Sequence, residues 1–336
     1  MTKFLLRLGV FLTISTAMVY GLDELVSGGL RNLKTGEFGT WSDLYHGRID
    51  ADLVIVGSSR AMVHVSPAIL SQQLGMSVYN LGNNGQHFPI QRIRFEEYRK
   101  FNRKPKWIIQ TVDITSLHDR RTAFQYEQFL PWFDHADLVD TISRYEGYQA
   151  MDYWIPMYRY RGRGELVTQG ISLALGIRTS SYDRDRGYIG RDFAWDETYD
   201  NFERTHKSGF VVPVEQTIEF SIEAFLHKQA VAGTTVIMVF TPEYLPAQHL
   251  CLNRDNVVSR LKRIAARNRT LFIDYSSDSI CKDQSMFYNS QHLNRMGAER
   301  FSQDLAKRLI VLQSGFKNPG RSVSPSWTQS PQQDAF

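Results

Sequence analysis

The sequence has few of the residues that mark several common protein classes. Of its 336 residues only two are cysteines, Cys251 and Cys281, which excludes a disulfide-rich scaffold. No Cys-x-x-Cys or His-x-x-x-His pair occurs, and the nine histidines are scattered, so we expect no metal and no cofactor. The two cysteines fit one disulfide in an oxidising compartment as well as two buried thiols, because sequence separation does not fix spatial separation.

An excess of charge is missing too. The chain carries 39 Lys and Arg against 35 Asp and Glu, and no basic run alternates with aromatic residues. This balance predicts no nucleic-acid partner. No Walker lysine pattern or Gly-x-Gly-x-x-Gly follows the first expected strand, which disfavours a nucleotide-binding domain. The composition, 42% hydrophobic and 22% charged, is that of a globular protein with a sizeable core.

The first segment with a clear signal is the N-terminus. Lys3 and Arg7 stand before or within an apolar stretch that ends at Asp23 and Glu24. The length predicts a transmembrane signal-anchor over residues 1–26, and the positive charge before it places the remaining chain on the extracytoplasmic, periplasmic side. A cleaved signal peptide is the alternative. Both interpretations export the rest of the chain.

A polar linker is expected over 27–48, followed by a regular α/β domain over 49–313. Five short apolar segments predict buried strands: 52–57, 77–80, 106–113, 234–241 and 271–275. A first helix is expected to begin at 66. Amphipathic segments predict further helices over 86–101, 214–232, 254–267 and 295–312. Strands alternating with helices favour a parallel sheet covered by helices on both faces.

Two regions depart from this alternation. Residues 116–213 are rich in aromatic residues and then in Arg, Asp and Gly, which predicts an inserted, mostly helical cap with an irregular stretch over 179–208. Residues 314–336 are rich in Pro, Ser and Gln, and this composition predicts a disordered tail.

Three segments at predicted strand ends carry chemistry. Residues 57–60 read Gly-Ser-Ser-Arg, and residues 80–85 contain Gly82 and Gly85. The third segment, residues 289–292, follows the last predicted strand and ends at His292. The carboxyl ends of parallel strands meet at one edge of a sheet, where ligands bind. A serine, backbone N–H groups that converge on an oxyanion and a histidine are the parts of nucleophilic acyl chemistry.

Taken in order, these segments resemble the motifs of the SGNH (GDSL-like) hydrolase superfamily, in particular exported members that acylate or deacylate cell-surface polysaccharides. The similarity covers about 50–112 and 214–312. It implies a three-layer, flavodoxin-like sheet with Ser59 as nucleophile, Gly85 as a backbone oxyanion donor and His292 as base. Other residues expected at the oxyanion or the substrate are Gly82, Asn84, Ser58 and Arg60, and Ser58 is an alternative for the exposed hydroxyl.

The third motif departs from the family's usual Gly-x-Asn-Asp. Residues 110–113 read Gln-Thr-Val-Asp, so Val112 stands where the family has an oxyanion-hole asparagine. Loss of one such donor costs about 10²–10³ in rate, unless Asn83 or Asn84 replaces it.

The residue that orients the histidine also departs from the family. Asn289 stands where an aspartate is usual, and in a serine triad this change costs about 10⁴ in rate. Asparagine still fixes the ring orientation in Cys-His-Asn enzymes. The alternatives are a Ser-His dyad without an orienting residue, or Asp278 or Asp283 in the place of the usual aspartate.

The resemblance implies an extracytoplasmic enzyme that transfers or hydrolyses acyl esters on a cell-envelope or secreted polysaccharide. Its expected partners are an acylated polysaccharide or acyl donor, the membrane through the N-terminal helix, and envelope-assembly proteins. The alternative is a catalytically degenerate protein of the same fold that binds glycan or serves as a scaffold in such an assembly. Residues Val112 and Asn289 are the features that support this alternative.

Overall fold

The computed structural model describes residues 1–317, and the chain divides into two compact units. One consists of residues 1–46 and 121–183, and the other consists of residues 47–120 and the chain from 184 onward. The single insertion expected at 116–213 is therefore shared between them. Residues 121–183 cluster with the N-terminal segment, while 184–213 belong to the unit that holds the sheet.

The first unit is helical. Its elements are α1 (Thr2–Leu30), α2 (Gly36–Tyr45), η1 (Tyr126–Trp132), α6 (Ala136–Ile142), α7 (Ala150–Trp154), η2 (Tyr158–Tyr160) and α8 (Gly164–Ala174). Glycine lets α1 and α8 approach closely, because a Cβ on Gly29 would lie 1.8 Å from the carbonyl oxygen of Gly170. The segment expected to be a polar linker thus holds the end of α1 and all of α2, whose Trp41 and Leu44 are fully buried.

Helix α1 is long and apolar enough to cross a membrane. It has 29 residues, a mean hydropathy of 1.6 in its most apolar window, and exposed side chains over that window. A signal sequence near the N-terminus has the same properties. The expected membrane-spanning segment is present as a helix, and the side of the membrane on which the rest lies stays a prediction.

The second unit is built on a five-stranded parallel sheet, as the sequence predicts. The strands are β1 (Leu53–Val56), β2 (Val78–Asn80), β3 (Trp107–Val112), β4 (Thr235–Phe240) and β5 (Leu271–Asp274). Their order across the sheet is β2-β1-β3-β4-β5, and every neighbouring pair is parallel. This is the flavodoxin-like order, in which the order of strand addition across the sheet reverses between β1 and β3.

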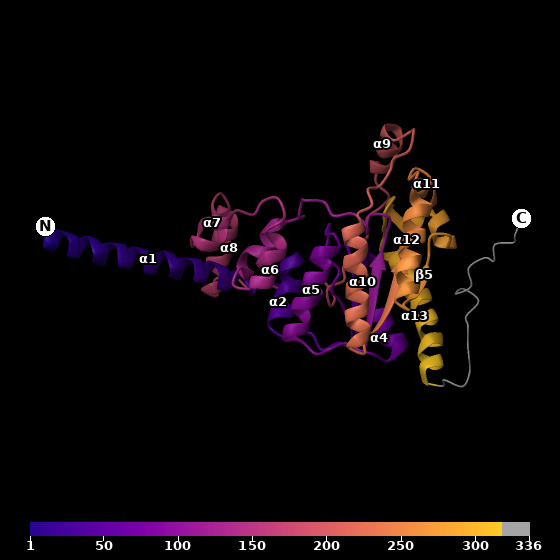
Figure 1. The fold of residues 1–336 in the computed structure, drawn as a ribbon, viewed down its shortest axis with the longest axis horizontal. Coiled ribbons are helices and arrows are strands. Elements are labelled where there is room, and N and C mark those ends of the chain that lie inside the picture. The colour runs from indigo at the N-terminus through magenta and orange to yellow at the C-terminus, as the bar shows by residue number, and fades with distance from the viewer. Residues whose placement is uncertain (318–336) are drawn as a thin grey trace, which may run out of the picture. The chain divides into compact units, whose positions relative to one another are not determined.

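Helices cover both faces of this sheet (Figure 1). Leu53, Ile109 and Ile237 point to one face, where they form a core with helices α3 (Ser59–His64), α4 (Pro67–Leu74) and α13 (Arg295–Lys317). The other face is covered by α5 (Phe88–Phe101), α10 (Gln216–Val231) and α12 (Arg254–Arg267), which pack against one another in that order. The bounds of α12 are those expected from the sequence.

The remaining elements of this unit lie near the carboxyl edge of the strands. They are α9 (Thr198–Thr205), α11 (Leu245–Gln248), η3 (Ser279–Lys282), η4 (Gln284–Met286) and the antiparallel pair β6 (Phe287–Asn289) and β7 (His292–Leu293). Helix α9 falls inside the stretch expected to be irregular. The expected disordered tail lies outside the described residues except for 314–317, which continue α13.

Both cysteines are buried free thiols. Burial raises the pKa of Cys281 to about 11, so this thiol stays protonated at neutral pH. Of the two alternatives that the sequence leaves open, the structure has the one without a disulfide.

Candidate active site

The candidate site lies at the carboxyl ends of β1 and β3, where the strand order reverses. The chain leaves β1 toward the face covered by α4, and it leaves β3 toward the face covered by α10. The two connections diverge and open a crevice between them, which is the usual position of a ligand site in such a sheet. Gly57 to Arg60 follow β1, and Asp113 follows β3.

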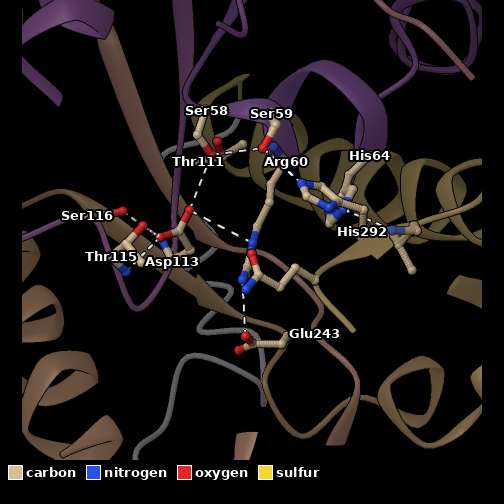
Figure 2. A network of polar contacts seen from close by, with 12 residues as sticks. Ser58, Ser59, Arg60, His64, Thr111, Asp113, Thr115, Ser116, Glu243 and His292 are labelled. Carbon is tan, nitrogen blue, oxygen red and sulfur yellow. Dashed lines mark hydrogen bonds and ion pairs between the residues drawn. The ribbon is translucent and has the colours of Figure 1, made fainter. Parts of the chain in front are cut away.

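The predicted nucleophile and base meet in this crevice (Figure 2). Oγ of Ser59 lies 2.8 Å from Nε2 of His292, although 233 residues separate them in the chain. Ser59 is the first residue of α3, and the Ser58 hydroxyl caps this helix by accepting from the N–H of Arg60. Residues 57–60 therefore begin a short helix instead of forming only a turn, and the helix start fixes the position of Ser59.

Asn289 sets the tautomer of the histidine. Its Oδ1 lies 3.0 Å from Nδ1 of His292 and also accepts from the backbone N–H groups of Gln291 and His292, at 3.0 and 2.9 Å. An amide oxygen only accepts hydrogen bonds, so Nδ1 must carry the proton. The lone pair of Nε2 then faces the hydroxyl of Ser59, as a general base requires.

The two aspartates considered as substitutes for Asn289 are engaged elsewhere. Asp278 accepts from the N–H of Ile280, and Asp283 accepts from the N–H of Ser285. Within the described part of the chain, Asn289 is therefore the residue that orients His292.

His292 is held in its neutral form. Burial and, second, the positive charge of Arg60 lower the pKa of His292 to about 3, against the opposing charges of Asp113 and Asp196. The ring of Tyr288 stacks on the imidazole with centroids 5.4 Å apart. At neutral pH the imidazole is available to accept a proton.

Beneath the site lies a buried ionic network (Figure 2). Arg60 is 3% exposed, and its guanidinium lies 3.1 Å from Glu243 and 3.9 Å from Asp113. The second carboxylate oxygen of Glu243 lies 2.7 Å from Arg254. Arg60, expected at the oxyanion or the substrate, lines the pocket, and its guanidinium is paired with these acids.

Asp113 is ionised within this network. Burial raises the pKa of its carboxyl, but Arg60 and the hydrogen bonds from Thr115 and Ser58 outweigh burial, so that its pKa lies below the ordinary value. The Ser58 hydroxyl donates to Asp113 at 3.2 Å. Ser58 thus faces an acid rather than the base, and Ser59 is the serine paired with His292.

A pocket of about 150 Å³ opens above these residues. It is lined by Ser58, Ser59, Arg60, Gly85, Gln86, His87, Asp113, Thr115, Arg120 and Gln291. Gly85 is exposed with φ of +66°, and the N–H of Ser59 lies in the first turn of α3, where a helix provides no acceptor for it. These are the two backbone donors expected for an oxyanion.

Three other residues considered for the oxyanion, Gly82, Asn83 and Asn84, do not line this pocket. Gly82 is buried under α3, where a Cβ would lie 2.5 Å from the backbone nitrogen of Met62, and its N–H donates to the side chain of Asn80. Gly82 therefore allows close packing and is not free to bind an oxyanion. Asn83 is fully buried, and neither Asn83 nor Asn84 lines the pocket. Val112 is buried as the last residue of β3.

Two further residues shape the site. His64, at the last position of α3, accepts at Nε2 from the N–H of Leu293, and this bond ties β7 to the helix that carries Ser59. Glu243 holds Arg60, as described above. Sequence reasoning missed Glu243, although its place just after β4 is the signal that could have found it. Among residues 1–317, no group of three His, Cys, Asp or Glu side chains is placed to hold a metal ion.

Comparison with known proteins finds similarity at the level of structure. No family model and no curated protein matches the sequence. Three similar solved structures are a protein described as an acylhydrolase from Bacteroides fragilis, a protein described as a lipolytic protein of the G-D-S-L family from Desulfitobacterium hafniense, and a GDSL-like lipase from Bacteroides thetaiotaomicron.

These similarities are distant. The identities are 12%, 11% and 10%, and the TM-scores are 0.35, 0.35 and 0.34. The matches cover 78%, 76% and 78% of this chain and 86%, 97% and 88% of the three structures. The assignment of chemistry therefore rests on this chain's own residues.

Proposed function

We propose that this protein is a serine-dependent acyl-ester enzyme of SGNH type, with Ser59 as nucleophile and His292 as base. The observation that carries the proposal is the 2.8 Å contact between Oγ of Ser59 and Nε2 of His292. The fixed tautomer and the lowered pKa of His292 support it, because both leave Nε2 unprotonated.

The reaction follows from this geometry. Nε2 of His292 takes the hydroxyl proton as Oγ of Ser59 bonds to the ester carbonyl carbon, and the N–H groups of Ser59 and Gly85 hold the resulting oxyanion. The tetrahedral intermediate collapses, its bond to the alcohol oxygen breaks, and His292 returns the proton to that oxygen. Water or a second hydroxyl then attacks the acyl-serine, with His292 again as base, and regenerates Ser59.

The identity of the acceptor separates two activities. Water as acceptor makes the protein an esterase, and a sugar hydroxyl makes it an O-acyltransferase. We propose a cell-envelope or secreted polysaccharide as the substrate, on the extracytoplasmic side of a membrane. The resemblance of the three motifs to exported polysaccharide-modifying enzymes and the apolar helix α1 support this choice.

Hydrolysis of p-nitrophenyl acetate tests the proposal. The full chain in detergent is compared with its Ser59→Ala and His292→Ala variants. Turnover by the unaltered chain and loss of at least about 10³-fold in both variants is expected, since removal of either group abolishes nucleophilic catalysis. Equal rates in the three proteins would contradict the proposal.

Two features favour a second function, that of a catalytically degenerate protein that binds glycan or serves as a scaffold. Asn289 provides no negative charge for the imidazolium that forms during the reaction, and the pocket has no side-chain amide at position 112. A degenerate protein would keep its function in the cell after Ser59→Ala, and an enzyme would lose it.

A further inference from the structure

A second cavity adjoins the catalytic pocket. It measures about 270 Å³ and shares Thr115, Arg120 and Gln291 with the catalytic pocket. Most of its wall is apolar and comes from Ile114, Phe202, Phe210, Val211, Val212 and Pro213. An apolar cavity beside the pocket of a nucleophilic serine is suited to the apolar part of an ester.

The wall of this cavity is ordered by ring contacts. Phe202 on α9 stacks on His206 with centroids 4.2 Å apart, and it meets Phe210 edge to face at 5.4 Å. His118, on the segment that follows β3, is fixed by Glu215 at 2.7 Å. These contacts fix side chains of the wall in the absence of a ligand, which reduces the order that has to be gained on binding.

A third pocket, which the base itself lines, has a different character. It is lined by Thr198, Asn289, Ser290 and His292, together with Phe202 and Gln291. Its volume is also about 270 Å³, and polar groups make up most of its lining. Phe202 and Gln291 line both this polar pocket and the apolar cavity, and therefore form the partition between them.

The direction of the reaction assigns a part of the substrate to each side. His292 must return its proton to the leaving alcohol, so we expect the alcohol on the side of the catalytic pocket that adjoins the polar pocket, which His292 also lines. The acyl group then extends the other way, past Thr115 and Gln291. From the two pockets and their partition we infer that the enzyme takes an ester with a polar alcohol and an aliphatic acyl chain longer than acetyl, with the chain in the apolar cavity.

The size of the cavity supports this inference, which itself rests on the proposed function. At about 30 Å³ for each water-sized group, 270 Å³ holds several methylene groups, and an acetyl group would leave most of it unfilled. Burial of each further methylene strengthens binding about fourfold. The rate constant kcat/KM should therefore rise with chain length until the cavity is full.

The test compares p-nitrophenyl acetate with p-nitrophenyl hexanoate, using the full chain in detergent. For the unaltered chain we expect kcat/KM to be at least tenfold higher with hexanoate. Val211 is 63% exposed at the cavity rim, so Val211→Trp should fold and place an indole in the cavity. This variant is expected to lower the hexanoate-to-acetate ratio at least tenfold. Val231→Trp is the matched control, because Val231 is 76% exposed at the end of α10 and lines none of the three pockets.

A binding measurement separates this inference from the proposed function. Titration calorimetry of the Ser59→Ala variant in amphipol, with hexanoate and with acetate, needs no turnover. Hexanoate should bind at least tenfold more tightly than acetate. The Ser59→Ala/Val211→Trp variant should lose this difference. Absence of hydrolysis with either ester would contradict the proposed function, and the titration would then decide on the cavity. Equal rates for the two esters, an unchanged ratio in Val211→Trp, or equal affinity for the two acids would overturn the inference.

Discussion

The side-chain oxygen of Asn289 lies 3.0 Å from Nδ1 of His292 and 2.9 Å from the backbone nitrogen of the same residue. A single amide oxygen thus fixes both the ring and the chain segment that carries it. It orients the base but brings no charge to the imidazolium, in a place where serine triads have a carboxylate. The protein has the geometry of a triad and a weaker electrostatic stabilisation.

Asn289→Asp should therefore raise activity. Aspartate has the same shape and keeps an acceptor for Nδ1 and for both N–H groups, while it adds the missing charge. We expect kcat/KM for p-nitrophenyl acetate to rise at least tenfold, with about 10⁴-fold as the limit set by serine triads. Asn256→Asp, which adds the same charge to an exposed position of α12, is the control. A rate that stays the same or falls in Asn289→Asp would show that the charge is not what the site lacks.

The pH dependence of activity should reflect the neutral state of His292. Its folded pKa, about 3, lies below the ordinary value of 6.5, so the base remains deprotonated in weak acid. The acid limb of kcat/KM reports the base in the free enzyme, and we expect its midpoint below about pH 5. Measurement of kcat/KM from pH 4 to 8 gives this midpoint. A midpoint between 6 and 7 would mean that the imidazole titrates as it does in water.

The same pKa shift affects stability. Between pH 6.5 and 3 the unfolded chain binds a proton at His292 that the folded chain does not bind, so the free energy of unfolding should fall as the pH falls through this window. His292→Gln, which cannot be protonated, should have a shallower pH dependence over the same range in urea denaturation. Parallel curves for the two proteins would contradict the assignment of this titration to His292.

Removal of Glu243 should destabilise the fold. Its carboxylate is buried between Arg60 and Arg254, and Glu243→Ala leaves two cations without this partner. Breaking a buried pair in this way costs about 3–5 kcal/mol in the free energy of unfolding. Glu223→Ala removes a carboxylate from a more exposed pair with Arg267 and should cost about 0–1 kcal/mol. Urea denaturation of both variants measures the difference, and equal losses would contradict the role given to the network.

The local pattern of the sequence is enough to predict the sheet and most of its helices. The β-branched run at 52–57 identifies β1, and the 254–267 segment predicts α12 at its observed bounds. Helix α3 could not be predicted in this way, because its six residues are too few for an amphipathic period and Gly-Ser-Ser-Arg is typical of a turn.

Contacts between distant segments account for what the sequence did not reveal. Ser59 and His292 could be paired only by analogy with known motifs, since nothing local connects them. The Arg60–Glu243–Arg254 network joins the ends of two strands to α12. The pairing of α1 with α8 depends on two glycines that are far apart in the sequence, Gly29 and Gly170. A hydrophobic pattern records which residues are buried but not which partner buries them.

Labelling with a fluorophosphonate probe, followed by peptide mapping, tests most directly that His292 activates Ser59. The reagent forms an adduct only with an activated serine. We predict one adduct, on the peptide that contains Ser59, in the full chain and in Ser58→Ala, and none in Ser59→Ala or in a folded His292→Ala. An unlabelled full chain, or a label that persists in Ser59→Ala, would contradict the account.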